Sequence, residues 1–246
     1  MTTSDTRKRK SRLPLIALIV VVAFLAALIG GEFYARNRVE TCLANQFESE
    51  LGSQIDVGLG FYPVLVQLAT KEFKSVEITS DDTKFGPAQD MKVSAEIDDV
   101  NLNNVSDTSS GTIGSSSADV DWSNSGIQAT LASQGIGGLI SGVTSDAAAG
   151  TLNFAIVGGL AQLTVKPVVA GDKIEVQTVD ANILGFGIPT DLADSVVSVL
   201  TDSLQAYPLG MTPQSIEVTD TGLKMSLTGG EYTMPAAQEG QQQISC

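Results

Sequence analysis

Oxygen-bearing side chains just after residue 118 are one group that could carry out chemistry, by binding a metal ion. Asp119, Asp121 and Asn124 resemble the opening of a calcium-binding loop, in which side-chain oxygens at set spacings coordinate the metal. Such a loop also needs glycine at its sixth position and glutamate at its twelfth. This chain has Asn124 and Thr130 there. The sequence therefore predicts a solvated strand end and no metal site.

Carboxylate pairs are the other candidates for chemistry. Asp81-Asp82 and Asp98-Asp99 could support hydrolysis only if folding brought two carboxylates together. The chain has no histidine, which excludes Ser-His-Asp and Cys-His catalysis and removes the commonest zinc ligand. It also has no phosphate-binding P-loop and no nucleophile elbow. We therefore expect a protein that is not an enzyme and has no cofactor.

The elements that would position any site begin with a long apolar run, residues 13–31, which contains no charged side chain. Nineteen helical residues extend roughly 28 Å, close to the thickness of a bilayer core. Five of the first twelve residues are basic, and the first charge after the run is Glu32. The positive-inside rule predicts a single-pass plasma-membrane anchor with a cytoplasmic N-terminus and an extracytoplasmic domain. A cleaved secretory signal is the alternative, although residues 28–31 suit cleavage poorly.

The two cysteines, Cys42 and Cys246, predict one disulfide if the chain is exported. The bridge would tie the last residue to the first segment after the apolar run. Closing a loop of about 205 residues would restrict the unfolded chain by about 5 kcal/mol in the chain-entropy model. Two free thiols are the alternative.

The chain is strongly acidic, with 28 acidic and 14 basic residues and a formal net charge of −14. The part beyond residue 31 holds all but one of the acidic residues. Nucleic-acid binding needs a basic footprint, so this charge argues against a nucleic-acid partner. It also argues against docking on an anionic bilayer by charge alone.

Hydrophobic periodicity predicts an α+β fold, with a curved antiparallel sheet wrapped on long amphipathic helices after one transmembrane helix. Helices are expected over residues 32–52, 63–69 and 190–204, and after a cap at Ser123 or Ser125. Strands are expected at residues 54–61, 73–79, 91–100, 119–122, 151–157, 162–169, 173–179, 215–218 and 223–227. Residues 101–118, rich in Ser, Gly and Asn, are expected to form a loop or flexible hairpin between two lobes.

These elements divide the chain into four parts. We expect a cytoplasmic basic tail (1–12), an anchor or signal (13–31), an exported domain (32–235) and a polar C-terminal tail (236–246).

Several short segments carry a family resemblance. They are Tyr-Pro-Leu-Gly-Met at 207–211, Ile-Glu-Val at 216–218, the turn and strand at 220–229, and in the N-terminal half residues 51–57 and 61–65. Together they resemble the LmeA-like phospholipid-binding family of actinobacterial cell-envelope proteins over about residues 35–235. The resemblance implies a fold similar to tubular lipid-binding (BPI-like) domains and a phospholipid ligand, including the phosphatidylinositol type. It also implies a supporting role in lipomannan maturation, with envelope glycosyltransferases as candidate partners.

Lipid binding needs a long apolar groove rather than titrating groups. We predict that six apolar residues line such a groove, although each alone would fit an ordinary core: Phe61, Leu65, Leu68, Val196, Val199 and Leu200. Three functions remain open at this point. They are a membrane-anchored lipid-binding protein, a non-catalytic envelope scaffold that binds other proteins, and a hydrolase that uses carboxylates.

Overall fold

The computed structural model describes residues 13–51, 54–85, 88–103, 105–106, 108–183, 186–187, 190–205 and 207–236. Within these ranges, side chains are described except at residues 13–18, 46–51, 81–85, 182–183, 186–187 and 190. Cys246 and all but the first residue of the expected C-terminal tail lie outside the described residues.

The chain begins with one long helix and continues with antiparallel strands and shorter helices. The helices are α1 (Leu13–Leu51), α2 (Val64–Thr70), α3 (Asn124–Ser133) and α4 (Thr190–Leu204), with single 3-10 turns at η1 (Val157–Gly159) and η2 (Pro208–Gly210). The strands are β1 (Asp56–Leu59), β2 (Glu72–Phe85), β3 (Ala88–Asn101), β4 (Ser109–Ile113), β5 (Ser115–Ser123), β6 (Ile140–Asp146), β7 (Thr151–Ile156), β8 (Ala161–Ala170), β9 (Lys173–Ile183), β10 (Phe186–Gly187), β11 (Thr212–Thr219), β12 (Gly222–Gly229) and β13 (Tyr232–Pro235).

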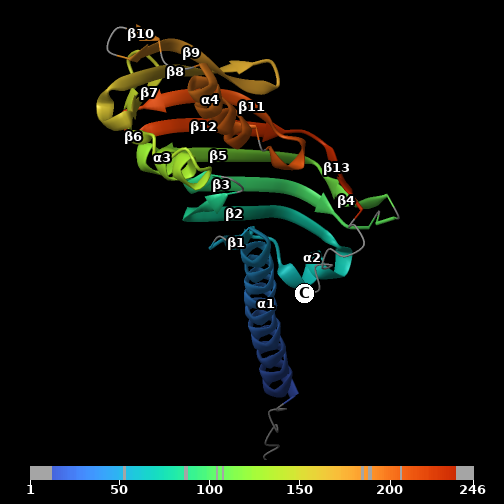
Figure 1. Ribbon diagram of the computed structural model, residues 1–246. Helices are drawn as coiled ribbons and strands as arrows, with labels where there is room; N and C mark the ends of the chain where they lie inside the picture. Colours follow the sequence, from blue (N-terminus) through green and yellow to red (C-terminus); the bar gives the residue numbers. More distant parts are fainter. Residues whose placement is uncertain are drawn as a thin grey trace, which may run out of the picture.

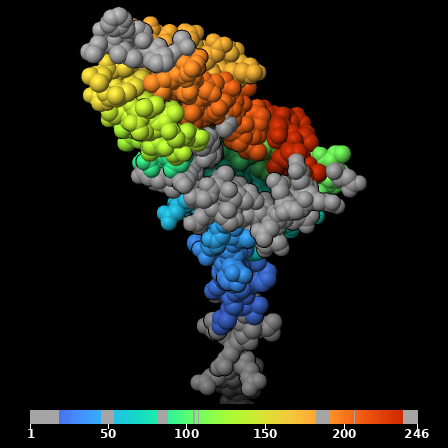
Figure 2. Space-filling view, viewed as in Figure 1, coloured from blue at the N-terminus to red at the C-terminus, as the bar shows by residue number. Residues whose placement is uncertain are grey.

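Helix α1 is continuous for 39 residues, so the apolar run and the helix expected after it form one element. It projects from the domain as a stalk (Figures 1 and 2). Within the described residues, it is the one helix long and apolar enough to cross a membrane, over Ile19–Asn45, with a mean hydropathy of 1.8. A membrane anchor and a signal sequence share these properties.

The strands form two antiparallel sheets (Figure 1). The larger sheet has the order β1-β2-β3-β5-β12-β11, and β4 joins it through β3 while pairing with β13. The smaller sheet has the order β10-β9-β8-β7-β6. Strand β11 contacts β8 and β6, which brings the two sheets together. The predicted α+β class with antiparallel sheets is therefore confirmed.

The main core lies where α3 and α4 meet both sheets. Its largest fully buried side chains include Trp122, Phe154 and Leu163. Ser123 caps α3 as predicted, because its Oγ accepts a hydrogen bond from Gly126 N at 3.0 Å. A Cβ on Gly126 would lie 2.7 Å from the carbonyl oxygen of Gln89, so only glycine lets this helix approach β3 so closely.

The expectation of a loop or flexible hairpin over residues 101–118 was wrong from residue 109 onward. Strands β4 and β5 occupy residues 109–113 and 115–118 of this segment, and β5 pairs with β3 on one side and β12 on the other. Along β5, Ser115 and Ser117 are exposed while Ser116 and Ala118 are buried. Pairing on both edges supplies the backbone hydrogen bonds, so it outweighs the weak strand preference of serine. Strands β6 and β13 were also missed.

A second, smaller group of buried residues lies at the end of the domain nearest α1. Ile55, Val57, Leu59 and Val64 are buried but do not belong to the main core cluster. The domain therefore has a base whose packing is separate from that of its main core.

Candidate functional site

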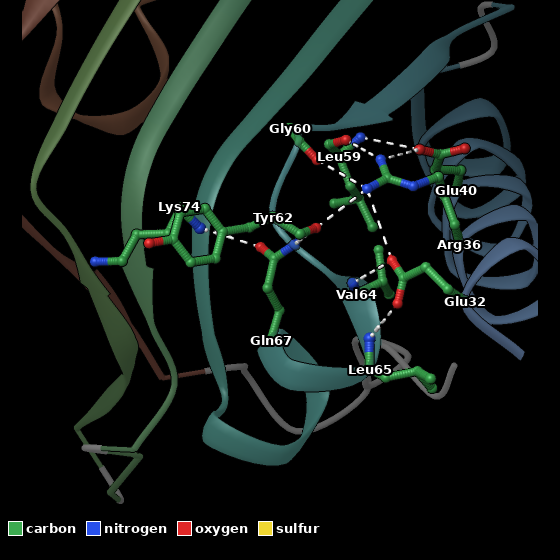
Figure 3. Close-up of polar contacts among 10 residues, drawn as sticks. All are labelled: Glu32, Arg36, Glu40, Leu59, Gly60, Tyr62, Val64, Leu65, Gln67 and Lys74. Atoms are coloured by element: carbon green, nitrogen blue, oxygen red, sulfur yellow. Dashed lines mark hydrogen bonds and ion pairs between the residues drawn. The ribbon is translucent and has the colours of Figure 1, made fainter. Parts of the chain in front are cut away.

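Three charged residues of α1 hold the base together. Glu32, Arg36 and Glu40 recur every four positions and so share one face of the helix (Figure 3). The Arg36 guanidinium donates hydrogen bonds to the carbonyl oxygens of Leu59, of Gly60 at 2.9 Å and of Tyr62 at 3.1 Å. We call Glu32, Arg36 and Glu40 the clasp.

The two carboxylates of the clasp accept hydrogen bonds from backbone amides. Glu32 accepts one from Val64 N and one, at 3.1 Å, from Leu65 N, the first two residues of α2. Glu40 accepts one from Leu59 N at 3.0 Å. Pro63, at the N-cap position of α2, makes no side-chain cap, so Glu32 satisfies these amides from another helix.

Helix α2 buries Val64 and the polar Gln67 and turns its other large apolar side chains outward. The buried Gln67 donates from Nε2 to Tyr62 O at 3.0 Å and accepts from Lys74 N at 3.1 Å through Oε1 (Figure 3). Five large apolar or aromatic residues on α2 and the preceding turn are exposed: Phe61, Tyr62, Leu65, Val66 and Leu68. We call these five residues the α2 patch.

Nearby, Lys74 Nζ lies 2.7 Å from a carboxylate oxygen of Asp99. Its hydrogen bond to this carboxylate raises the pKa of Lys74 above its ordinary value.

An apolar surface continues from the base across the larger sheet. Strand pairing sets Val57 opposite Ile78, and Leu59 opposite Val76, so these side chains share one face. The next strand sets Ile97 opposite Val76. Val76, Ile78 and Ile97 are only partly buried. We call these three residues the sheet floor.

One buried hydroxyl borders the sheet floor. Ser116 is paired with Ile97 across β5 and β3, and its Oγ has no hydrogen-bond partner among the described residues. A Cβ on Gly229 would lie 2.4 Å from this oxygen, so the glycine leaves space for the hydroxyl.

The groove on the outer face of the larger sheet is lined by charged as well as apolar side chains. It has a volume of about 530 Å³, crosses β2, β3, β5, β12 and β11 and is lined by Lys92, Asp119, Asp121, Glu217 and Lys224, among others. Asp121 lies 3.6 Å from Lys224, so it is paired with a cation. No group of three possible metal ligands occurs in the part of the chain that the structure describes.

The six residues predicted to share one groove are separated. Phe61, Leu65 and Leu68 are exposed in the α2 patch, whereas Val196 and Leu200 are buried in the main core and Val199 is partly buried. The amphipathic face of α4 packs against β9 and the core, while α2 contacts α1 and β2 (Figure 1). The sequence predicts a groove wall for both faces, because apolar periodicity is the same for a core and for a binding surface. A lipid contact stays a prediction for all six residues.

The structure describes only one of the two cysteines of the predicted disulfide. Cys42 is half-buried on α1, beside β1 and the base, and it is not a free thiol. Because Cys246 lies outside the described residues, its pairing with Cys42 stays a prediction.

The clasp was not predicted, although the sequence carried a signal for it. A Glu-x3-Arg-x3-Glu spacing places alternating charges on one helical face, a pattern that supports exposed helices by itself. The sequence did not indicate that this face would bind backbone groups of residues 59–65.

Comparison with known proteins gives the family. The family model described as LmeA-like phospholipid-binding matches residues 26–228. The chain belongs to this family. The sequence resemblance is thereby confirmed, and the family is described by the phospholipid that it binds rather than by a reaction.

The curated relatives have no described function that could be compared. Uncharacterized proteins of Mycobacterium bovis and Mycobacterium tuberculosis are each 33% identical over 239 residues, covering 94% of this chain and 68% of the relative. No solved structure matches the chain significantly.

Proposed function

We propose that this protein is a single-pass plasma-membrane protein whose extracytoplasmic domain binds phospholipid on the sheet floor. The main observation in support of this proposal is that Val76, Ile78 and Ile97 are only partly buried. They lie between the main core and a helix that is long and apolar enough to cross a membrane. Acyl chains need an apolar surface of this kind, and the family description gives the ligand class. The N-terminus is cytoplasmic and α1 is uncleaved in this proposal.

The finer assignments follow from the family resemblance. We propose phosphatidylinositol-type lipid as the ligand, a supporting role in lipomannan maturation, and envelope glycosyltransferases as partners. We propose a tubular lipid-binding arrangement of the BPI-like kind, which is compatible with two antiparallel sheets that carry α3 and α4, with α1 projecting from the β1 edge (Figure 1). Binding without catalysis is the simplest chemistry for an apolar surface.

The test is the lipid content of the full chain, purified from its own membranes in mild detergent and extracted for mass spectrometry. We expect phosphatidylinositol-type lipid with the parent and with a Val179→Asp control, whose site is exposed on β9. An Ile97→Asp variant should lose the lipid while keeping the parent's circular dichroism spectrum. Equal lipid in both variants would reject the sheet floor as the site. Its absence from every sample, together with no lipid transfer between vesicles, would reject the function.

An envelope scaffold is the second candidate. The outer groove across β3, β5 and β12 carries charges of both signs, which suits a protein surface better than an acyl chain. A scaffold would yield no bound lipid in the extraction, and crosslinking in intact membranes would capture partners through this groove. Substituting Lys92 and Lys224 with Glu would then abolish the crosslinks, whereas lipid binding at the floor would be unaffected.

A further inference from the structure

The α2 patch has the opposite polarity to a helix that faces water. Only Val64 and Gln67 are buried in α2, and Gln67 is a polar residue. Phe61 is fully exposed, and Tyr62, Val66, Leu68 and Leu65 are 56%, 51%, 44% and 40% exposed. A short helix in water normally buries its apolar side chains and exposes its polar ones. In α2, three of the four large apolar side chains are exposed and only Val64 is buried, which favours an apolar surrounding.

The patch lies at the height where the apolar part of α1 ends. A Cβ on Gly31, the last residue of the apolar run, would lie 3.8 Å from Leu65 Cδ1. The next residue, Glu32, bonds the first amides of α2. Helix α2 therefore begins beside the residue where the chain changes from apolar to charged, within about one helical turn of the expected edge of the hydrocarbon core.

Aromatic residues gather at this height from two elements. Phe33 and Tyr34 of α1 are 71% and 69% exposed, directly after the apolar run. Phe61 and Tyr62 follow β1 and are carried to the same end of the domain by the clasp. Phenylalanine and especially tyrosine suit the boundary between headgroups and acyl chains, where one end of the ring is apolar and the other wet.

From these observations we infer that the α2 patch inserts into the outer leaflet of the same bilayer that α1 spans. The domain then has two membrane contacts, a spanning helix and an interfacial one, held at a fixed height by Glu32 and Arg36. The occupant is lipid, because the patch continues directly from the membrane-spanning surface of α1. No positive charge is required, which agrees with the acidic character of the exported part.

This seating would bring the base, and the sheet floor beside it, close to the leaflet that holds phospholipid. The inference rests on the uncleaved anchor of the proposed function, but it does not require a bound lipid. The two proposals can therefore fail separately.

The test uses tryptophan fluorescence of the full chain in phosphatidylcholine vesicles that contain brominated phosphatidylcholine. A Phe61→Trp variant places the probe in the patch, and a Val179→Trp variant replaces another exposed apolar side chain, on β9. The native Trp122 is fully buried in the main core and supplies a constant background, measured with the parent chain. Mass spectrometry first verifies that α1 is present.

We expect the Phe61→Trp emission to shift to shorter wavelength. It should be quenched most by bromine near the headgroup end of the acyl chain, because interfacial helices lie about 5–10 Å deep. The Val179→Trp emission should match that of the parent in quenching. Equal quenching of the two variants would overturn the inference. So would a wavelength shift that disappears when protein is diluted in lipid, since a second copy of the chain would then cover the patch.

Discussion

Removing the Arg36 side chain tests whether the clasp holds the base. Arg36→Ala leaves three carbonyl oxygens, those of Leu59, Gly60 and Tyr62, without their donor. Alanine favours helix, so α1 itself should remain intact. The effect is therefore expected in residues 59–65 rather than in α1.

The magnitude follows from the exposure of the site. Hydrogen bonds to charged donors contribute about 1.5–3 kcal/mol when buried. The Arg36 side chain is 26% exposed, so water replaces part of the loss. Taking about 1 kcal/mol for each carbonyl gives about 3 kcal/mol, and we add nothing for the partly exposed ion pairs. A change of that size raises the local opening constant roughly 100-fold.

Hydrogen exchange of the full chain in detergent measures this opening directly. The amides of Leu59, Val64 and Leu65, which donate to the clasp carboxylates, should exchange roughly 100-fold faster in Arg36→Ala than in the parent. Arg38→Ala is the matched control, since Arg38 lies on the same helix and is exposed. It should leave these amides unchanged.

Two results would refute this reasoning. Unchanged exchange in Arg36→Ala would mean that the clasp does not hold residues 59–65. Faster exchange throughout the domain, including β8 residues of the main core such as Leu163, would mean that the base is not a separate packing unit.

Four further predictions concern the core, a hydroxyl, a phenol and the thiols. Val196→Asp should unfold the domain rather than merely release lipid, because Val196 is fully buried and the substitution should cost about 4 kcal/mol or more of unfolding free energy. Thermal unfolding measures this loss. The control Ser198→Asp, on the exposed face of α4, should unfold at the same temperature as the parent. Ser116→Ala should raise the free energy of unfolding by about 1 kcal/mol, since it removes an unpartnered buried hydroxyl, and denaturant unfolding that shows a loss would contradict this. Burial raises the pKa of the Tyr207 phenol above its ordinary 10.0, so the unfolded chain loses this proton at a lower pH than the folded chain. The contribution of Tyr207 to the free energy of unfolding should therefore be full below about pH 10 and fall as the pH rises through the folded-state pKa. Unfolding measured as a function of pH should show this fall in the parent but not in Tyr207→Phe. Thiol labelling of the native chain should find no reactive cysteine before reduction and two after it, and two reactive thiols at the outset would exclude the bridge.

Sequence periodicity identified most elements because each depends on a local pattern. Residues 190–204 form the predicted helix with the same bounds, and Ser123 caps α3 as expected. Alternating apolar residues located β1, β7 and β8 within a few positions. In these segments, the residue pattern and the tertiary environment favour the same conformation.

The sequence failed where a segment depends on distant partners. Ser116 and its neighbours form a central strand because β3 and β12 pair with both of its edges. One partner strand precedes β5 in the chain and the other follows it, and no local sequence pattern predicts either pairing. The same holds for β13, which pairs with β4 more than a hundred residues earlier.

The sequence by itself determined that the chain has a long apolar N-terminal helix, an acidic antiparallel domain and the segments of a phospholipid-binding family. Only the tertiary structure decided which apolar residues are core and which remain at the surface. It buried Val196 and Leu200 and left Phe61 and Leu65 exposed near the end of the apolar run, where Arg36 binds Gly60 O and Glu32 binds Leu65 N. The physical reason is that periodicity fixes which side chains share a face, whereas contacts between distant elements fix what that face meets.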